Sequence, residues 1–206
     1  MSVTTTRRRT AALLLGAALV TLTATACGST GGPSVATEPK APASAGSTDT
    51  AGGQSAKPAE SKAPEAPKAA KVGDTIALKG MDKGNTADIT VVKVVDPAQS
   101  SNEYLKPADG MRYVAVQFQI KATGAKAYSE TPWSSAKVVD AQGQAYGPNL
   151  ADTKAGPSFQ TPTNIAAGET GKGFIAFEVP TDAKLDKVQF ALDSGFADQV
   201  GQWKIG

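Results

Sequence analysis

Apolar residues recur at every second position in several stretches of the chain after residue 71. The clearest stretch is 114–121, where Val, Val, Phe and Ile alternate with Ala, Gln, Gln and Lys. Residues 175–179 and 188–193 show the same period. Successive side chains of a strand point to opposite faces, so this period predicts strands with one buried face and one wet face. Residues 89–95 carry valine in both phases, which predicts a more central strand.

Turn-forming residues separate these stretches and shorter apolar ones at 76–78 and 138–139. Asp109-Gly110, Ala167-Gly168 and Ser194-Gly195 supply the positive φ that tight turns require. No stretch of ten residues shows a helical apolar stripe without Gly or Pro. The pattern therefore predicts an all-β domain over 71–206, an antiparallel immunoglobulin-like β-sandwich of about seven strands. Residues 142–164 are rich in Pro and Gly and are expected to be either a mobile loop or a wandering edge strand.

The first 26 residues have the composition of a secretory signal. Three arginines at 7–9 precede an apolar run at 11–25, and small residues lead to Cys27, the only cysteine of the chain. This junction resembles the bacterial lipobox, in which the signal is removed before a cysteine whose thiol then receives a diacylglyceryl group. We therefore predict a lipoprotein signal peptide at 1–26 and a lipidated Cys27 that anchors the protein, through acyl chains such as palmitate, outside the cell membrane.

Two alternatives to this interpretation of Cys27 stay open. The cysteine could be a chance thiol after an ordinary signal peptide, because Ala24 stands where lipoboxes favour leucine. A membrane-spanning anchor is less favoured, since the apolar run is shorter than the ~20 residues that a bilayer requires. Export by the Sec route is expected, with the twin-arginine route as the alternative.

Residues 27–70 are predicted to be the lipidated cysteine and a disordered linker. Residues 28–70 contain no aromatic residue, and Val35 is their only large aliphatic side chain. Such a composition buries too little apolar surface to offset the entropy of ordering. We expect the linker to hold the domain away from the lipid surface.

Charge and composition exclude several classes of function. Removal of residues 1–26 takes away three arginines and no acid, which leaves 18 basic and 19 acidic side chains. This balance provides no positive field for nucleic acid, so no nucleic-acid partner is expected. The chain contains no histidine, the commonest general base and metal ligand. We therefore expect no enzyme activity, no metal and no cofactor.

Motifs with catalytic or metal-binding spacing are weak. Ser134 and Lys137 have the Ser-x-x-Lys spacing of serine acyltransferases, but they are predicted on a strand, where side chains three apart face opposite sides. Asp82, Asn85 and Asp88 lack the EF-hand pattern and are better explained as a turn before the strand at 89. Four acids lie in predicted turns or on the predicted wet faces of strands and are therefore expected to be ordinary surface residues: Glu169, Glu178, Asp182 and Asp186.

The order of several short motifs resembles a widespread family of uncharacterised telokin-like, immunoglobulin-like domains that bacterial lipoproteins carry behind a low-complexity linker. The matching pieces are residues 72–75, 89–91, 110–116, 139–146, 165–169 and 173–180. The sequence departs from the family at Ala122-Thr123-Gly124, where the family commonly has an asparagine. The resemblance implies a β-sandwich; because the family has no agreed activity, it implies no catalytic residue.

Aromatic side chains are the best candidates for contacts, because they dominate protein interfaces and also stack on sugars. Trp203 is expected to fill the sandwich core. Trp133, Tyr128 and Tyr146 are proposed as a contact patch.

We predict a non-catalytic, monomeric surface lipoprotein that binds a protein or a cell-envelope polymer and contacts the membrane only through its lipid. The alternative is a small-molecule carrier or sensor with a pocket between the sheets or under 142–164. A cavity of ~300 Å³ or more with converging polar groups would favour that alternative.

Overall fold

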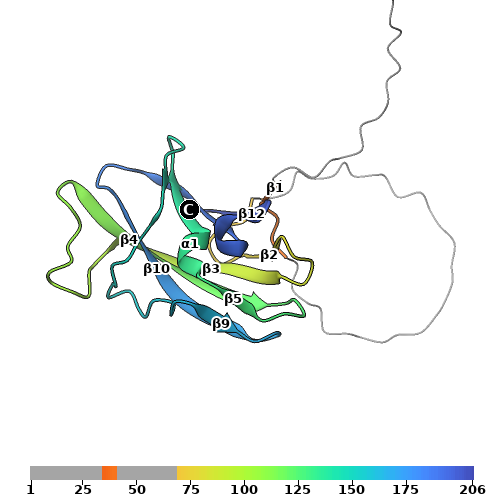
Figure 1. Ribbon diagram of the computed structural model, residues 1–206. Helices are drawn as coiled ribbons and strands as arrows, with labels where there is room; N and C mark the ends of the chain where they lie inside the picture. Colours follow the sequence, from red (N-terminus) through yellow and green to blue (C-terminus); the bar gives the residue numbers. More distant parts are fainter. Residues whose placement is uncertain (1–33, 41–68) are drawn as a thin grey trace, which may run out of the picture. The chain divides into compact units, whose positions relative to one another are not determined.

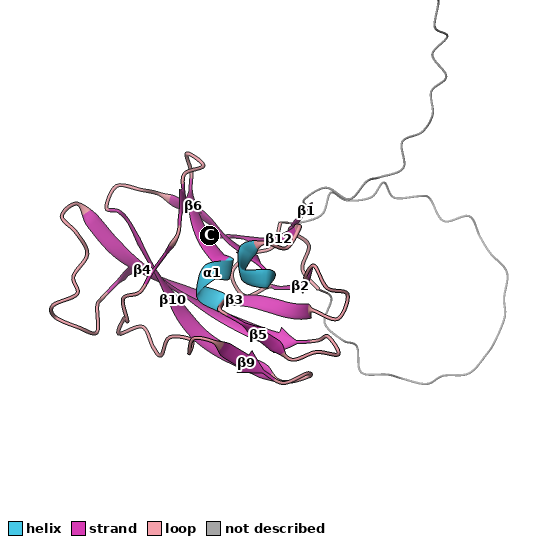
Figure 2. Ribbon diagram, viewed as in Figure 1, coloured by secondary structure: helices cyan, strands magenta, loops and turns pink. Residues whose placement is uncertain are grey.

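The longest strands coincide with the stretches of regular alternation. β3 (Thr86–Ala98), β4 (Met111–Ala122) and β10 (Thr170–Pro180) lie side by side and antiparallel in one sheet. β3 lies between β2 (Thr75–Lys79) and β4, which confirms the central strand predicted at 89–95. Figure 1 shows these strands crossing the domain, and Figure 2 shows that strands make up most of it.

The computed structural model describes residues 34–40 and 69–206. The predicted signal peptide and Cys27 lie outside these residues. The remaining elements are β1 (Ser34–Ala36), β5 (Tyr128–Glu130), α1 (Pro132–Ser135), β6 (Ala136–Asp140), β7 (Ala145–Tyr146), β8 (Pro148–Asn149), β9 (Thr163–Ile165), β11 (Leu185–Ala191), the 3-10 helix η1 (Asp193–Gly195) and β12 (Gln199–Lys204).

Two five-stranded sheets face each other. One has the order β2-β3-β4-β10-β8 and the other β1-β12-β11-β6-β7, while β5 and β9 form a separate pair. The strand pairs are antiparallel except for β1 with β12. The all-β sandwich predicted from the sequence is confirmed, and its described residues contain more strands than the seven expected because short edge strands were added.

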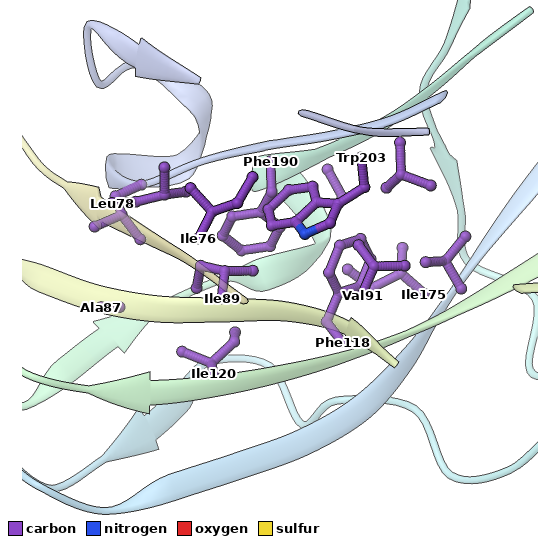
Figure 3. Packing of buried hydrophobic residues seen from close by; sticks show 14 of the residues in the cluster. Ile76, Leu78, Ala87, Ile89, Val91, Phe118, Ile120, Ile175, Phe190 and Trp203 are labelled. Atoms are coloured by element: carbon purple, nitrogen blue, oxygen red, sulfur yellow. The ribbon is translucent and has the colours of Figure 1, made fainter. Parts of the chain in front are cut away.

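The core lies between the sheets and is filled by the inward phase of the alternating stretches. Trp203 is fully buried, and its Nε1 donates a hydrogen bond to the Asp74 carbonyl at 2.9 Å. The Phe118 and Phe190 rings, one from each sheet, lie with centroids 5.2 Å apart (Figure 3). The prediction that Trp203 is the core tryptophan is confirmed.

Part of the outer face of the β3-β4-β10 sheet is covered and buried from solvent. Ala115 and Phe174 are buried there in a second cluster with Ala98, Tyr113 and Ala151. The cover comes from the predicted excursion at 142–164, which pairs with β10 through β8 and through a bridge between Ser158 and Phe174. Of the two expectations for this segment, the wandering edge strand is the one observed.

Residues 34–40 differ from the disordered linker predicted for 27–70. β1 pairs in parallel with β12, in the register Ser34–Gln199, Val35–Val200 and Ala36–Gly201. The sequence pattern could not indicate this strand, because a three-residue edge strand takes its stability from a partner that is distant in the sequence.

Candidate functional site

The three aromatic residues predicted as a contact patch do not form one. Tyr128 lies on β5 with 1% of its surface exposed, so its side chain belongs to the core and is closed to any partner. Trp133 in α1 and Tyr146 in β7 are half-buried against the same core. The pairing of β5 with β9 places Tyr128 opposite Ile165 and turns its ring inward, which corrects the prediction.

Tyr146 has a structural role in the β6–β7 hairpin. Its hydroxyl donates to Asp140 Oδ2 at 2.8 Å, and Asp140 Oδ1 accepts the backbone N–H groups of Gln142 and Gln144 at 3.0 and 2.8 Å. Desolvation alone would raise the pKa of Asp140, but these hydrogen bonds outweigh it and lower that pKa below its ordinary value. The hairpin is therefore held by its own carboxylate.

Arg112, the only arginine after residue 9, joins three segments. Its Nε and Nη2 donate to the two Asp96 carboxylate oxygens at 2.6 and 2.9 Å. The guanidinium also donates to the Pro180 and Ala183 carbonyls. The Asp96 hydrogen bond, opposed by desolvation, raises the pKa of Arg112 above its ordinary value. Every contact of this guanidinium is internal, so it stabilises the fold and is not a ligand site.

The residues with catalytic or metal-binding spacing are dispersed. Ser134 is exposed in α1 and Lys137 is exposed on β6, so they share no cleft. Glu178 accepts hydrogen bonds from Asn149 and from the Ala108 N–H, and Asp186 pairs with two lysines. Within residues 34–40 and 69–206, no group of three His, Cys, Asp or Glu residues is placed to hold a metal.

One polar cluster was not foreseen from the sequence. Asn85 Nδ2 donates to Glu130 Oε1 and Asp193 Oδ1 at 2.9 and 2.7 Å, and Asp193 Oδ2 accepts the Met81 N–H. Asp193 and Ser194 both adopt left-handed φ values, 54° and 56°, which are costly for non-glycine residues. The hydrogen bonds to Glu130 and Asn85 hold this turn in place, so the cluster joins the β2–β3 turn, β5 and η1.

The candidate site is a recess at the β8 edge of β10, under the segment that follows β8. Its volume is about 180 Å³. The apolar walls come from Trp133, Leu150, Phe159 and Phe174. It is more enclosed than the neighbouring hollow lined by residues 163–172.

Two glycines allow the covering segment to lie close to β10. A side chain at Gly173 would come within 2.7 Å of the Phe159 ring and 2.8 Å of its backbone nitrogen. Gly156 has φ +151°, and a side chain there would come within 2.6 Å of the Phe174 ring. The Phe159 and Phe174 rings occupy this space, and the recess lies where they meet.

Polar groups at the recess are paired with one another. Asn149 donates to Glu178 and its Oδ1 accepts the Ala151 N–H, both at 2.9 Å. Ser158 Oγ donates to Asp152 Oδ1 at 2.7 Å. These bonds fix the position of the covering segment. The Trp133 Nε1–H is buried and has no acceptor among the residues that the structure describes.

Large apolar side chains stand exposed at the recess and in the β3–β4 connection that is hydrogen-bonded to the covering segment. Leu150 is 83% exposed, and Tyr104 and Leu105 in the β3–β4 connection are 86% and 52% exposed. The two segments are joined by hydrogen bonds from the Ser101 N–H to the Asp152 carbonyl and from the Lys154 N–H to the Gln99 carbonyl. We call Tyr104, Leu105 and Leu150 the apolar rim. A more polar hollow, lined by residues 100–104 and Lys154, lies next to the apolar rim.

The sequence did not identify this site, although one signal was available. Phe174 and Ile175 are consecutive large apolar residues in a strand. Their side chains must face opposite sides, which indicates that both faces are covered at this point.

The fold and site define a β-sandwich domain of immunoglobulin-like architecture with a side-chain-sized recess at the edge of one sheet. Residues 81–200 match the family described as Domain of unknown function (DUF4352), and the chain belongs to this family. This confirms the resemblance inferred from the sequence. No curated protein matches the chain.

Several solved structures are similar to the chain. The secreted protein MPT63 from Mycobacterium tuberculosis is 20% identical, with a TM-score of 0.47 over 65% of this chain and 94% of that chain. The ycdA protein of Bacillus subtilis, a predicted lipoprotein, is 13% identical, with a TM-score of 0.49 over 66% and 38%. An uncharacterised β-sandwich protein from Clostridium difficile is 15% identical, with a TM-score of 0.40 over 70% and 100%.

Proposed function

We propose that the protein is a non-catalytic binding module of the cell envelope, anchored by lipid on Cys27, and that it binds a protein partner at the recess and the apolar rim. The observation that carries the proposal is the recess of about 180 Å³ with exposed Leu150 on its edge. Apolar side chains that stay exposed next to a preformed hollow are typical of interaction sites.

The size of the recess favours a protein side chain over a small-molecule ligand. Pockets for drug-sized ligands measure roughly 300–1,000 Å³, whereas a cavity of ~150 Å³ accepts a benzene-sized group. At about 180 Å³ the recess fits one aromatic or branched aliphatic side chain. Apart from the Trp133 Nε1–H, which has no acceptor among the described residues, the polar groups around it are paired with each other, so they offer few contacts to a polar ligand. This favours the interaction module over the carrier or sensor.

One feature of the sequence supports a location outside the cell membrane. The sequence has a positive, apolar and small-residue order that ends at Cys27. Among the residues that the structure describes, no helix has the length and apolarity needed to cross a membrane. Globomycin, which blocks cleavage of lipoprotein signals, is expected to retain the unprocessed chain, and an unchanged processed size would contradict the lipid anchor.

The binding proposal is tested with the mature chain, residues 27–206, carrying Cys27→Ser to keep it in solution. The chain is immobilised and exposed to envelope extract, and captured proteins are quantified by mass spectrometry for native, Leu150→Ser and Met81→Ser forms. Met81 is 72% exposed and lies in the β2–β3 turn, at the other end of the 13-residue strand β3. A specific partner should be lost at least about tenfold with Leu150→Ser only, as expected for a hot-spot residue. Equal recovery by all three forms would refute the site.

A further inference from the structure

The segment at residues 34–40 is bonded to the domain along its whole length. The Ser34 N–H donates to the Asp198 carbonyl at 2.7 Å, and the β1 residues pair with residues 199–201 of β12. Beyond β1, the Lys40 N–H donates to the Thr75 carbonyl and the Ala70 N–H donates to the Thr37 carbonyl, at 2.7 and 2.6 Å. We call residues 34–40 the strap.

The two faces of the strap differ. Ala36 packs against the main core cluster, whereas Val35 is 56% exposed. Lys40 Nζ forms an ion pair with Asp88 Oδ2 at 2.5 Å, and the Asp88 side chain is only 12% exposed. Backbone pairing, one inward side chain and one terminal ion pair together are the contacts of a strand added to a sheet edge.

The strap also brings two distant parts of the chain to the same place. Lys40, the last residue of the strap, is hydrogen-bonded to Thr75. Residues 70–72 pair through backbone hydrogen bonds with Lys204 at the end of β12. The strap and the start of the domain at residues 69–75 are therefore hydrogen-bonded to each other as well as to β12. Because the strap belongs to the same chain, its local concentration at the β12 edge is on the order of millimolar, which favours docking on its own domain.

We propose that the strap sets the distance between the domain and the membrane: docked, it holds the domain near its lipid, and released, it lets the domain extend. This inference rests on the lipid anchor at Cys27 of the proposed function. Six residues lie between Cys27 and Ser34, so seven Cα–Cα steps limit the docked tether to about 25 Å. Release makes residue 69 the attachment point, and the 42 Cα–Cα steps from Cys27 to residue 69 then allow at most about 140–150 Å.

Docking also places the start of the strap at one end of the domain. Ser34 bonds at Asp198, next to Gln199, whose Oε1 accepts the Lys79 N–H at the end of β2. The β2–β3 turn follows Lys79, so the tether enters at the turn end of β3. The apolar rim follows the opposite end of β3, and Figure 1 shows the connection before β4 at the far side of the sheet. Ser34 and the β3–β4 connection therefore lie at opposite ends of β3.

The docking step is tested by hydrogen exchange on residues 34–40 in the soluble chain 27–206 with Cys27→Ser. Ala36→Asp places a charge against the core and should raise exchange of the strap amides at least about tenfold, while exchange of β4 stays unchanged as a control for folding. Val35→Asp, the same change on the exposed face, should leave exchange unchanged. Lys40→Glu, which sets two acids against each other, should also release the strap. Strap amides that exchange equally in the native and Ala36→Asp chains would overturn the proposal.

The tether length is tested on vesicles of phosphatidylcholine that contain a maleimide lipid and a dansyl lipid. The native chain is coupled through Cys27, so the result is independent of whether cells acylate this residue, which the globomycin experiment decides. Energy transfer from tryptophan to dansyl should be high for the native and Val35→Asp chains and lower for Ala36→Asp. Equal transfer for a docked and a released chain would overturn the proposal and leave the binding role of the apolar rim standing.

Discussion

Tyr128 has a buried hydroxyl that the fold leaves poorly paired. The residue is 1% exposed, and its Oη forms no hydrogen bond of normal geometry within the described residues; the Ser135 hydroxyl, which acts on it as a weak hydrogen-bond partner, also has none. In the unfolded chain this hydroxyl is hydrated, so folding removes its water and returns only a weak contact with Ser135. A buried polar group without a partner costs about 1–3 kcal/mol. We therefore expect Tyr128→Phe, which keeps the ring and deletes the hydroxyl, to raise the free energy of unfolding by about 1–2 kcal/mol.

Tyr146→Phe is the matched control, because the same atom is removed from a hydroxyl that donates to Asp140 at 2.8 Å. This change should lower the stability, so the two variants should move in opposite directions. Urea unfolding of the chain 27–206, followed by tryptophan fluorescence, gives the midpoint and slope for each form. For a domain of this size, 1 kcal/mol corresponds to a shift in melting temperature of roughly 3–5 °C.

The outcome that refutes this reasoning is a loss of stability above about 0.5 kcal/mol in Tyr128→Phe. Such a loss would mean that the hydroxyl has a hydrogen-bond partner, for example a buried water. An unchanged slope of the urea transition is needed in both variants, because a changed slope would report on the unfolded state.

Three further predictions follow from the contacts. Gly173→Ala should displace Phe159 and weaken capture at the recess, because its methyl group would lie 2.7 Å from the ring; in thermal unfolding it should cost roughly 1–3 kcal/mol, and an unchanged melting temperature would contradict the packing. Arg112→Lys keeps the charge but loses the forked contact with Asp96, so urea unfolding should show a loss of about 1–2 kcal/mol, and full retention would mean that charge alone is sufficient. The chain has no histidine, so its unfolding free energy should be nearly constant from about pH 5.5 to 8.5. The lowered pKa values of Asp140, and of Asp186 through its hydrogen bond to Lys204, give stability that is present above the unfolded pKa near ~4 and is lost as the pH falls below it. Burial raises the pKa of Tyr128, which gives stability present below ~pH 10 and lost as the pH rises further. A step in stability near pH 6.5 would contradict this profile.

Alternation in the sequence was sufficient to predict the sandwich, because the inward phase of each long strand is apolar over its whole length. Val114, Val116, Phe118 and Ile120 are all fully buried, as expected. The same reasoning failed at Ala115, because alternation describes a strand and its own sheet but not a segment 40 residues later that covers the other face. Alanine fits either environment, so its burial could not be inferred.

The candidate site was less predictable than the fold. Tyr128 lies in a polar stretch of sequence, yet the β5–β9 pairing turns it into the core. The recess forms from residues of α1, of the segment after β8 and of β10, which are brought together by packing of two glycines against two phenylalanine rings. No local pattern encodes such a meeting of three segments. The strap is even harder to predict from the sequence than the recess, since its composition is that of an unstructured linker apart from Val35.

Seating of β1 on β12 also affects the solubility of the domain. Without it, the backbone N–H and C=O groups at residues 199–201 would form an open sheet border, the kind of surface that recruits strands from other molecules and begins aggregation. Residues 34–36 satisfy this border from within the chain. A recombinant fragment that begins at residue 69 would therefore lose its protection against self-association, and residues 34–68 should be kept in any sample prepared for crystallisation.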